Sequence, residues 1–112
     1  MIIQVFGTKK SKATQKAVRF FKERRIQIQE IDLSQKAVSK GELNSIRRSV
    51  PLNELIDTEC SEYEKRNYRY IKHDVEEVLL ENPLLFKMPV VRMGDRATAG
   101  YCEDVWKEWI KK

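Results

Sequence analysis

The sequence predicts one α/β domain, and patterns at its two ends support this prediction. An apolar run at residues 2–6 leads into Gly7 and then into a segment with apolar residues at helical spacing. A second apolar stretch covers residues 26–33, so the first third is typical of a strand, a helix and a parallel strand. Residues 89–101 have the pattern of an antiparallel strand pair, and a helix follows them.

Helical patterns fill the middle of the chain. Ser39 and Glu42 have the spacing of a capping box, which predicts a helix that starts there and ends near Pro51. Pro51 can open another turn, since proline is tolerated at the first helical position. This turn would contain Leu52, Leu55 and Ile56.

The second half of the chain continues with further helices. Residues 57–71 are polar and aromatic, and we interpret them as a helix. An acidic start and apolar spacing predict a short amphipathic helix over 74–81, which Asn82-Pro83 ends. The last predicted helix covers residues 103–112 and has four apolar residues on one face: Val105, Trp106, Trp109 and Ile110.

Length and composition limit the classes of protein. With 112 residues, 41% of them hydrophobic and 35% charged, the chain can bury the core of one domain. It contains no apolar stretch of about 18 residues and no secretory or lipidation signal, so we expect a cytoplasmic monomer without a membrane segment. Cys60 and Cys102 have no metal-ligand or CxxC spacing. We therefore expect neither a metal nor a cofactor.

Positive charge is concentrated near the N-terminus. The net charge is +5, and residues 1–25 contain eight basic residues and one acidic residue. Lys9, Lys12, Lys16 and Arg19 follow one another at spacings of three or four, which predicts one shared helix face. Such a stripe is either a solvated face or a surface for an anionic partner.

The turn at residues 7–13 is the predicted functional site. Unpaired N–H groups and the helix dipole at a helix start attract anions or stabilise a thiolate. Lys9, Lys10 and Lys12 add positive charge, and Ser11 occupies the position of a nucleophile. Serine is also a favoured helix N-cap. A nucleophilic serine would need a general base, and the only histidine, His73, has no serine motif to accompany it, so we interpret Ser11 as the cap.

Several motifs together resemble one known family. An aromatic residue and a glycine end the first strand, a Lys-Ala pair lies inside the helix, and Asp32 ends the second strand. These features resemble the arsenate reductase (ArsC) and Spx family of thioredoxin-fold proteins. The resemblance continues at 43–50, at 57–59 with Tyr63, at 81–83, at 87–91, at Gly100-Tyr101 and at Trp106.

The resemblance implies a fold and a set of boundaries. The expected architecture is a thioredoxin/glutaredoxin-like fold with a helical insertion between its βαβ and ββα halves. The halves would cover residues 1–39 and 87–112, and the insertion about 40–86. The family's loop proline corresponds to Pro89, so the resemblance implies a cis peptide bond there, beside the turn at residues 7–13.

Three departures from the family pattern concern its chemistry. Ser11 stands where the family has its reactive cysteine, Met88 where an arginine precedes the loop proline, and Glu59 where an arginine follows Asn-Thr. A hydroxyl cannot perform the exchange of a thiolate, and neither Met88 nor Glu59 can clamp an oxyanion. We therefore expect a binding or regulatory module without reductase activity.

The expected binding residues for an anion or a partner lie at the turn and at the loop proline: Thr8, Lys9, Lys10, Ser11, Lys12 and Pro89. Resemblance to Spx implies a protein partner, RNA polymerase, and direct binding of nucleic acid is not expected.

The alternative interpretation is a thiol oxidoreductase with a relocated thiol. Cys102 follows Gly100-Tyr101 at the start of the last helix, where N–H groups lower a thiol pKa, and the resemblance places this loop near the lost cysteine. Glutathione or thioredoxin would then be the electron donor. We expect Cys60, flanked by Glu59 and Glu62, to be inert, and His73 to be a surface residue at a helix start.

Overall fold

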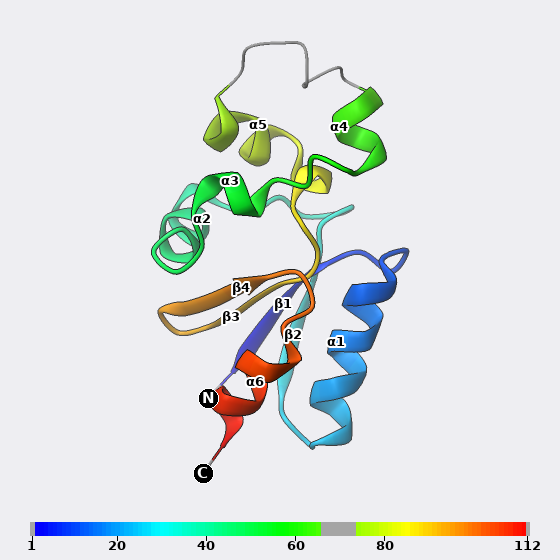
Figure 1. The fold of residues 1–112 in the computed structure, drawn as a ribbon, viewed down its shortest axis with the longest axis vertical. Coiled ribbons are helices and arrows are strands. Elements are labelled where there is room, and N and C mark those ends of the chain that lie inside the picture. Colours follow the sequence, from blue (N-terminus) through cyan, green and yellow to red (C-terminus); the bar gives the residue numbers. More distant parts are fainter. Residues whose placement is uncertain (1, 66–73, 112) are drawn as a thin grey trace.

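The computed structural model describes residues 2–65 and 74–111 and contains a four-stranded mixed sheet, with strand order β2-β1-β3-β4 (Figure 1). The strands are β1 (Ile3–Gly7), β2 (Ile28–Asp32), β3 (Val90–Met93) and β4 (Arg96–Ala99). β1 pairs with β2 in parallel and with β3 antiparallel, and β3 forms an antiparallel pair with β4. Both predicted end units are confirmed, and β1 and β3 join them into one sheet.

One face of the sheet is covered by α1 (Lys12–Glu23) and α6 (Glu103–Ile110). The centre of this layer is Trp106, which is fully buried. Its ring centroid lies 5.3 Å from that of Phe21 and 5.7 Å from that of Phe20, both on α1. The indole Nε1–H donates to Thr98 Oγ1 on β4 at 2.9 Å. Trp106 therefore joins the last helix to the first one and to the edge of the sheet.

The buried face of α6 differs from the predicted one at a single residue. Trp106, Trp109 and Ile110 pack inward together with Cys102, whereas Val105 is 42% exposed. The buried stripe of α6 begins at Cys102 and is centred on Trp106, so Val105 lies outside it and faces solvent. The prediction that Val105 shares the buried face is wrong.

The helical insertion lies between β2 and β3 and covers one end and the other face of the sheet (Figure 1). It contains α2 (Lys40–Ile46), α3 (Leu52–Leu55), α4 (Ser61–Lys65), α5 (Val75–Glu81) and a 3₁₀ turn, Pro83–Leu85. Its apolar residues form a second core with Phe6 and Val90, whose side chains point away from the Trp106 layer because strand residues alternate between faces. None of the helices in residues 2–65 and 74–111 has the length and apolar character needed to span a bilayer.

Two helix starts in the insertion are as predicted. Ser39 caps α2 in a reciprocal capping box with Glu42, and Asp74 caps α5. The predicted end of α2 near Pro51 is wrong, because the helix ends at Ile46 and a turn follows. The Ser49 hydroxyl donates to Asp95 O in the β3–β4 turn at 2.9 Å, which anchors this segment to the sheet.

The predicted helix over 57–71 is confirmed only in α4. Asp57 begins a turn, because its carboxylate accepts a hydrogen bond from Glu59 N at 3.0 Å. Ile56 is extended rather than helical and forms an isolated β-bridge with Phe86. Asp57 N donates to Leu85 O at 2.8 Å and Lys87 N donates to Leu55 O at 2.7 Å. These two hydrogen bonds and the Ile56–Phe86 bridge hold the beginning and the end of the intervening segment together, and we call this pairing the neck. The remaining residues, 66–71, lie outside the described part of the chain.

Close contact between Gly7 and Thr14 holds the start of α1 against the end of β1. A Cβ on Gly7 would lie 2.3 Å from Thr14 Oγ1. Thr14 is buried, and no described residue forms a hydrogen bond with its Oγ1. Only glycine at position 7 allows this approach of helix and strand.

The change Gly7→Ala is expected to lower the free energy of unfolding by about 1–3 kcal/mol, the usual cost of overpacking a core. Gly41→Ala is the matched control, since a Cβ there meets nothing within 4 Å and the residue is helical. It should stabilise the protein by up to about 1 kcal/mol. Urea unfolding followed by circular dichroism measures both, and equal effects of the two changes would contradict the close approach.

A second prediction concerns the hydrogen bond between Trp106 and Thr98. Thr98→Val keeps the side-chain shape but leaves the buried indole N–H without an acceptor, and should cost about 1–3 kcal/mol. Thr98→Ser retains the hydroxyl and should cost less than Thr98→Val. Thermal unfolding of both variants tests the order, and a more stable Val variant would show that the hydrogen bond is unimportant.

Candidate functional site

The turn between β1 and α1 holds Ser11 as a helix cap. Its Oγ accepts a hydrogen bond from Thr14 N at 3.2 Å, and its own N–H donates to Thr8 O at 3.1 Å. Ser11 has the extended backbone conformation of an N-cap, with φ −79° and ψ 115°. The interpretation of Ser11 as the cap of the first helix is confirmed, and its hydroxyl is engaged in that role.

A hollow of about 490 Å³ opens beside this cap, and we call it the Ser11 hollow. Three segments line it: the turn, the insertion and the chain that leads into β3. The lining residues are Thr8, Lys10, Ser11, Asp57, Cys60, Ser61, Glu62, Leu84, Phe86 and Met88.

Met88 brings the loop proline segment to the turn. The Met88–Pro89 peptide bond is cis, as the resemblance implies. Thr8 Oγ1 donates to Met88 Sδ at 3.6 Å, so a thioether faces the turn where the family pattern has an arginine. Pro89 itself is buried, and its carbonyl accepts a hydrogen bond from Gly100 N at 2.9 Å.

The charge of the Ser11 hollow differs from the expected electropositive site. Its lining includes one ammonium group, that of Lys10, and two carboxylates, those of Asp57 and Glu62. Glu62 accepts a hydrogen bond from Asn82 Nδ2 at 3.1 Å. Lys12 lines none of the described cavities around the turn. The insertion thus brings carboxylates to the helix start, which the local sequence of the turn could not indicate.

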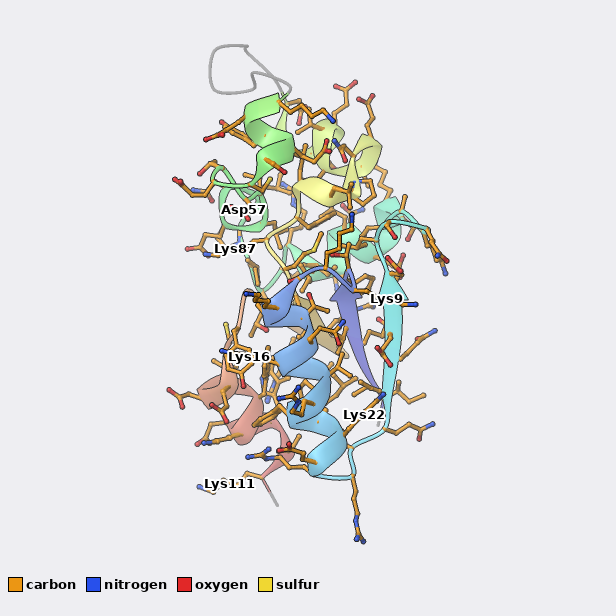
Figure 2. The ribbon with its side chains drawn as sticks, turned by 90° about the vertical axis from the view of Figure 1, so that its right-hand side faces the viewer. Lys9, Lys16, Lys22, Asp57, Lys87 and Lys111 are labelled. Atoms are coloured by element: carbon orange, nitrogen blue, oxygen red, sulfur yellow. The ribbon has the colours of Figure 1, made fainter. Side chains whose placement is uncertain are left out.

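Lys9 lies on the other side of the turn. It lines a cavity of about 300 Å³ between α1 and β2, together with Glu30 and Asp32. Figure 2 shows Lys9 and Lys22 on the β2 side of α1 and Lys16 on the side of α6. The prediction that Lys9 belongs to one basic face with Lys16 is therefore wrong. The cause is that α1 begins only at Lys12, so the helical spacing does not extend back to Lys9.

Asp32, the family's strand-end aspartate, has a structural role. Its Oδ1 accepts hydrogen bonds from Ser34 N at 2.9 Å and Ser34 Oγ at 2.6 Å. These hydrogen bonds lower the pKa of the Asp32 carboxyl, so it is ionised at neutral pH. Such a carboxylate caps the turn after β2 and is unsuited to proton transfer.

Cys60 is the cysteine that the fold brings to Ser11. Its thiol lines the Ser11 hollow and donates to Asp57 O at 3.1 Å. Burial raises the pKa of the Cys60 thiol, and the nearby Asp57 charge adds to the rise. This direction agrees with an inert thiol, although the contributing carboxylate is Asp57 rather than the sequence neighbours Glu59 and Glu62. The family-like Asp57-Thr58-Glu59 segment was the one sequence signal that could have placed Cys60 near the turn.

Cys102 does not line the Ser11 hollow. It is the N-terminal residue that flanks α6, its thiol donates to Ala99 O at 3.5 Å, and it packs against the Trp106 layer. It lines a groove of about 630 Å³ with Glu59, Asp57 and Lys87, the last two labelled near each other in Figure 2. Cys102 and Ser11 share none of the described cavities. His73 lies outside the described residues.

Fold and site together define the class of the protein. A parallel βαβ unit, an antiparallel ββα unit and a cis proline next to the start of α1 form a thioredoxin-like fold with a helical insertion. The profile of the ArsC family matches residues 6–109. The chain therefore belongs to the ArsC family.

Solved structures agree with this assignment. Arsenate reductase from Vibrio cholerae is similar with a TM-score of 0.80 and 18% identity, over 96% of this chain and 97% of that one. The protein SACOL0876 from Staphylococcus aureus COL has a TM-score of 0.74 and 27% identity, over 95% and 96%. A glutaredoxin from Archaeoglobus fulgidus has a TM-score of 0.50 and 16% identity, over 98% and 86%. Comparison with curated proteins gave no significant match.

Two thiols in the Ser11 hollow are predicted to differ in acidity. A cysteine introduced by Ser11→Cys, with Cys60 and Cys102 changed to serine, would face the N–H groups of the first turn of α1 and should have a pKa below the free value of about 8.5. Cys60 in a Cys102→Ser background is the comparison, and its pKa should lie above that value because it is partly buried. The pH dependence of alkylation, followed by mass spectrometry, measures both. The same pKa for the two thiols would contradict the helix-start geometry.

Proposed function

We propose that this ArsC-family protein does not reduce arsenate and acts as a binding or regulatory module for a protein partner. The main support is the identity and role of residue 11. The Ser11 hydroxyl caps α1 at the position where the family pattern has a reactive cysteine. Reduction in this family type needs a thiolate that attacks, forms an adduct and leaves by exchange. A hydroxyl that accepts a hydrogen bond from Thr14 N offers no such step.

The lining of the Ser11 hollow supports the same proposal. Arginines recognise a tetrahedral oxyanion with paired hydrogen bonds, and Met88 has none to donate. Asp57 and Glu62 place two carboxylates opposite the single ammonium of Lys10, which opposes the entry of an oxyanion. Glu59, the other arginine position of the pattern, lines the neighbouring groove and adds negative charge.

The competing proposal is a thiol oxidoreductase that uses Cys102 with glutathione or thioredoxin. Cys102 packs against the Trp106 layer and does not line the Ser11 hollow, and both observations favour a binding module over this enzyme. The turn residues Thr8, Lys9, Lys10, Ser11 and Lys12 remain proposed contacts of the partner at this end of the sheet, whereas Pro89 is buried and is withdrawn as a contact. Resemblance to Spx makes RNA polymerase in the cytoplasm a candidate partner.

Wild-type protein is expected to give no arsenate-dependent NADPH oxidation in a coupled glutaredoxin or thioredoxin assay. Loss of a single oxyanion donor typically lowers a rate by about 10²–10³, and here a nucleophile is missing as well. The Vibrio cholerae arsenate reductase is the positive control, and Ser11→Cys tests whether a thiol alone restores turnover. Turnover by the wild-type protein above the control without protein would overturn the proposed function, and loss of that turnover in Cys102→Ser would identify the competing one.

A further inference from the structure

The side of α1 that faces α6 carries a surface with no role in the site described above. Lys16 and Arg19 of α1, Arg24, which follows α1, and Tyr101, which precedes α6, line a shallow hollow of about 180 Å³. We call these four residues the α1–α6 surface.

Two of these side chains are ordered before any partner arrives. The Arg24 guanidinium lies over the Phe20 ring, with its central carbon 3.9 Å from the centroid, and its Nη1 donates to Phe20 O at 3.1 Å. The Tyr101 ring meets Trp106 edge to face, with centroids 5.0 Å apart. Since the groups are already fixed, binding costs less side-chain entropy. Tyrosine and arginine in such positions are the residue types that dominate binding energy in protein interfaces.

The same surface combines an exposed aromatic ring with two cationic side chains that have no ion-pair partner among the described residues. Tyr101 is 41% exposed. Elsewhere on α1, Lys22 forms an ion pair with Glu30 at 3.5 Å. Lys16 and Arg19 form no ion pair with any described residue. An occupant would therefore gain both apolar burial and charge pairing here.

We propose that the α1–α6 surface binds an acidic segment of a partner protein that also presents an aromatic or aliphatic side chain. Carboxylates of the segment pair with Lys16 and Arg19, and its apolar side chain packs against the ring of Tyr101. Glu23 and Glu103 line the same hollow, so the carboxylates of the segment must be spaced to meet Lys16 and Arg19 and to avoid these two glutamates. A nucleic acid fits less well, because the regular spacing of its phosphates does not allow this selection. This inference rests on the proposed function of a protein-binding module and gives it a surface away from the Ser11 hollow.

The experiment selects displayed random peptides on the intact wild-type protein and measures the Kd of the leading synthetic peptide by fluorescence anisotropy. The enriched peptides should combine Asp or Glu with an aromatic or aliphatic residue. Arg19→Glu and Tyr101→Ala should each raise the Kd about tenfold or more, as loss of a central contact does. Arg48→Glu is the matched control, because it makes the same charge change at an exposed residue of the insertion, and it should leave the Kd unchanged.

Lys16→Glu is included because Tyr101 contacts the buried Trp106, so that Tyr101→Ala can affect folding. The Lys16 side chain is exposed and has no ion pair with a described residue, so this change should weaken binding without lowering the thermal midpoint. The affinity should also fall with added salt, since exposed charge pairs are screened.

Several results would overturn the inference. They are the failure to enrich any peptide, enrichment of basic peptides, equal weakening by Arg19→Glu and Arg48→Glu, or tighter binding of a DNA duplex than of the leading peptide. Self-association of the wild type that Arg19→Glu abolishes would assign the surface to a second copy of the chain instead. The arsenate assay is independent: turnover there overturns the proposed function, whereas a failed selection without turnover overturns only the α1–α6 surface.

Discussion

The burial of Trp106 is the interaction on which the arrangement of the two halves depends. Its indole fills the space between α1 and α6, and its N–H is paired with Thr98 on the edge strand. Contacts of one side chain thus hold segments from the beginning and the end of the chain in the same layer. The position of α1 fixed in this way also determines where its first turn, and therefore Ser11, meets the insertion. On the outside, the same indole supports the ring of Tyr101.

The start of α1 shows how one side chain can satisfy a helix terminus. An N-cap serine satisfies an N–H group that would otherwise be unpaired, and such a cap contributes about 1 kcal/mol to stability. A thiolate at the same position would be stabilised by the same groups. Ser11 therefore has a structural role at this turn, and the Thr8–Met88 contact brings the cis proline segment to it. What the insertion adds, through Asp57 and Glu62, is negative charge.

The sequence predicted those elements whose hydrogen bonds and packing involve residues that are close together in the chain. The capping box at Ser39 and the caps at Asp74 and Ser11 follow from near neighbours in the sequence, and apolar runs indicated the strands. Sequence reasoning failed where distant segments decide. The Phe86 bridge makes Ile56 extended, and only the folded chain brings Cys60 beside Ser11. Hydrophobic periodicity reports on neighbouring residues and gives no information about contacts between such distant segments.

The neck at Ile56 and Phe86 has a consequence for how such a protein can change over evolutionary time. Two short backbone hydrogen bonds close the segment between them, so added residues in an exposed loop of that segment leave the closure in place. Lengthening a closed loop costs little, about 0.6 kcal/mol for each doubling. Exposed loops beyond the neck can therefore gain length and acquire new surface chemistry, whereas Tyr63, Val78, Leu79 and Leu85 are held by the core that they share with Phe6 and Val90.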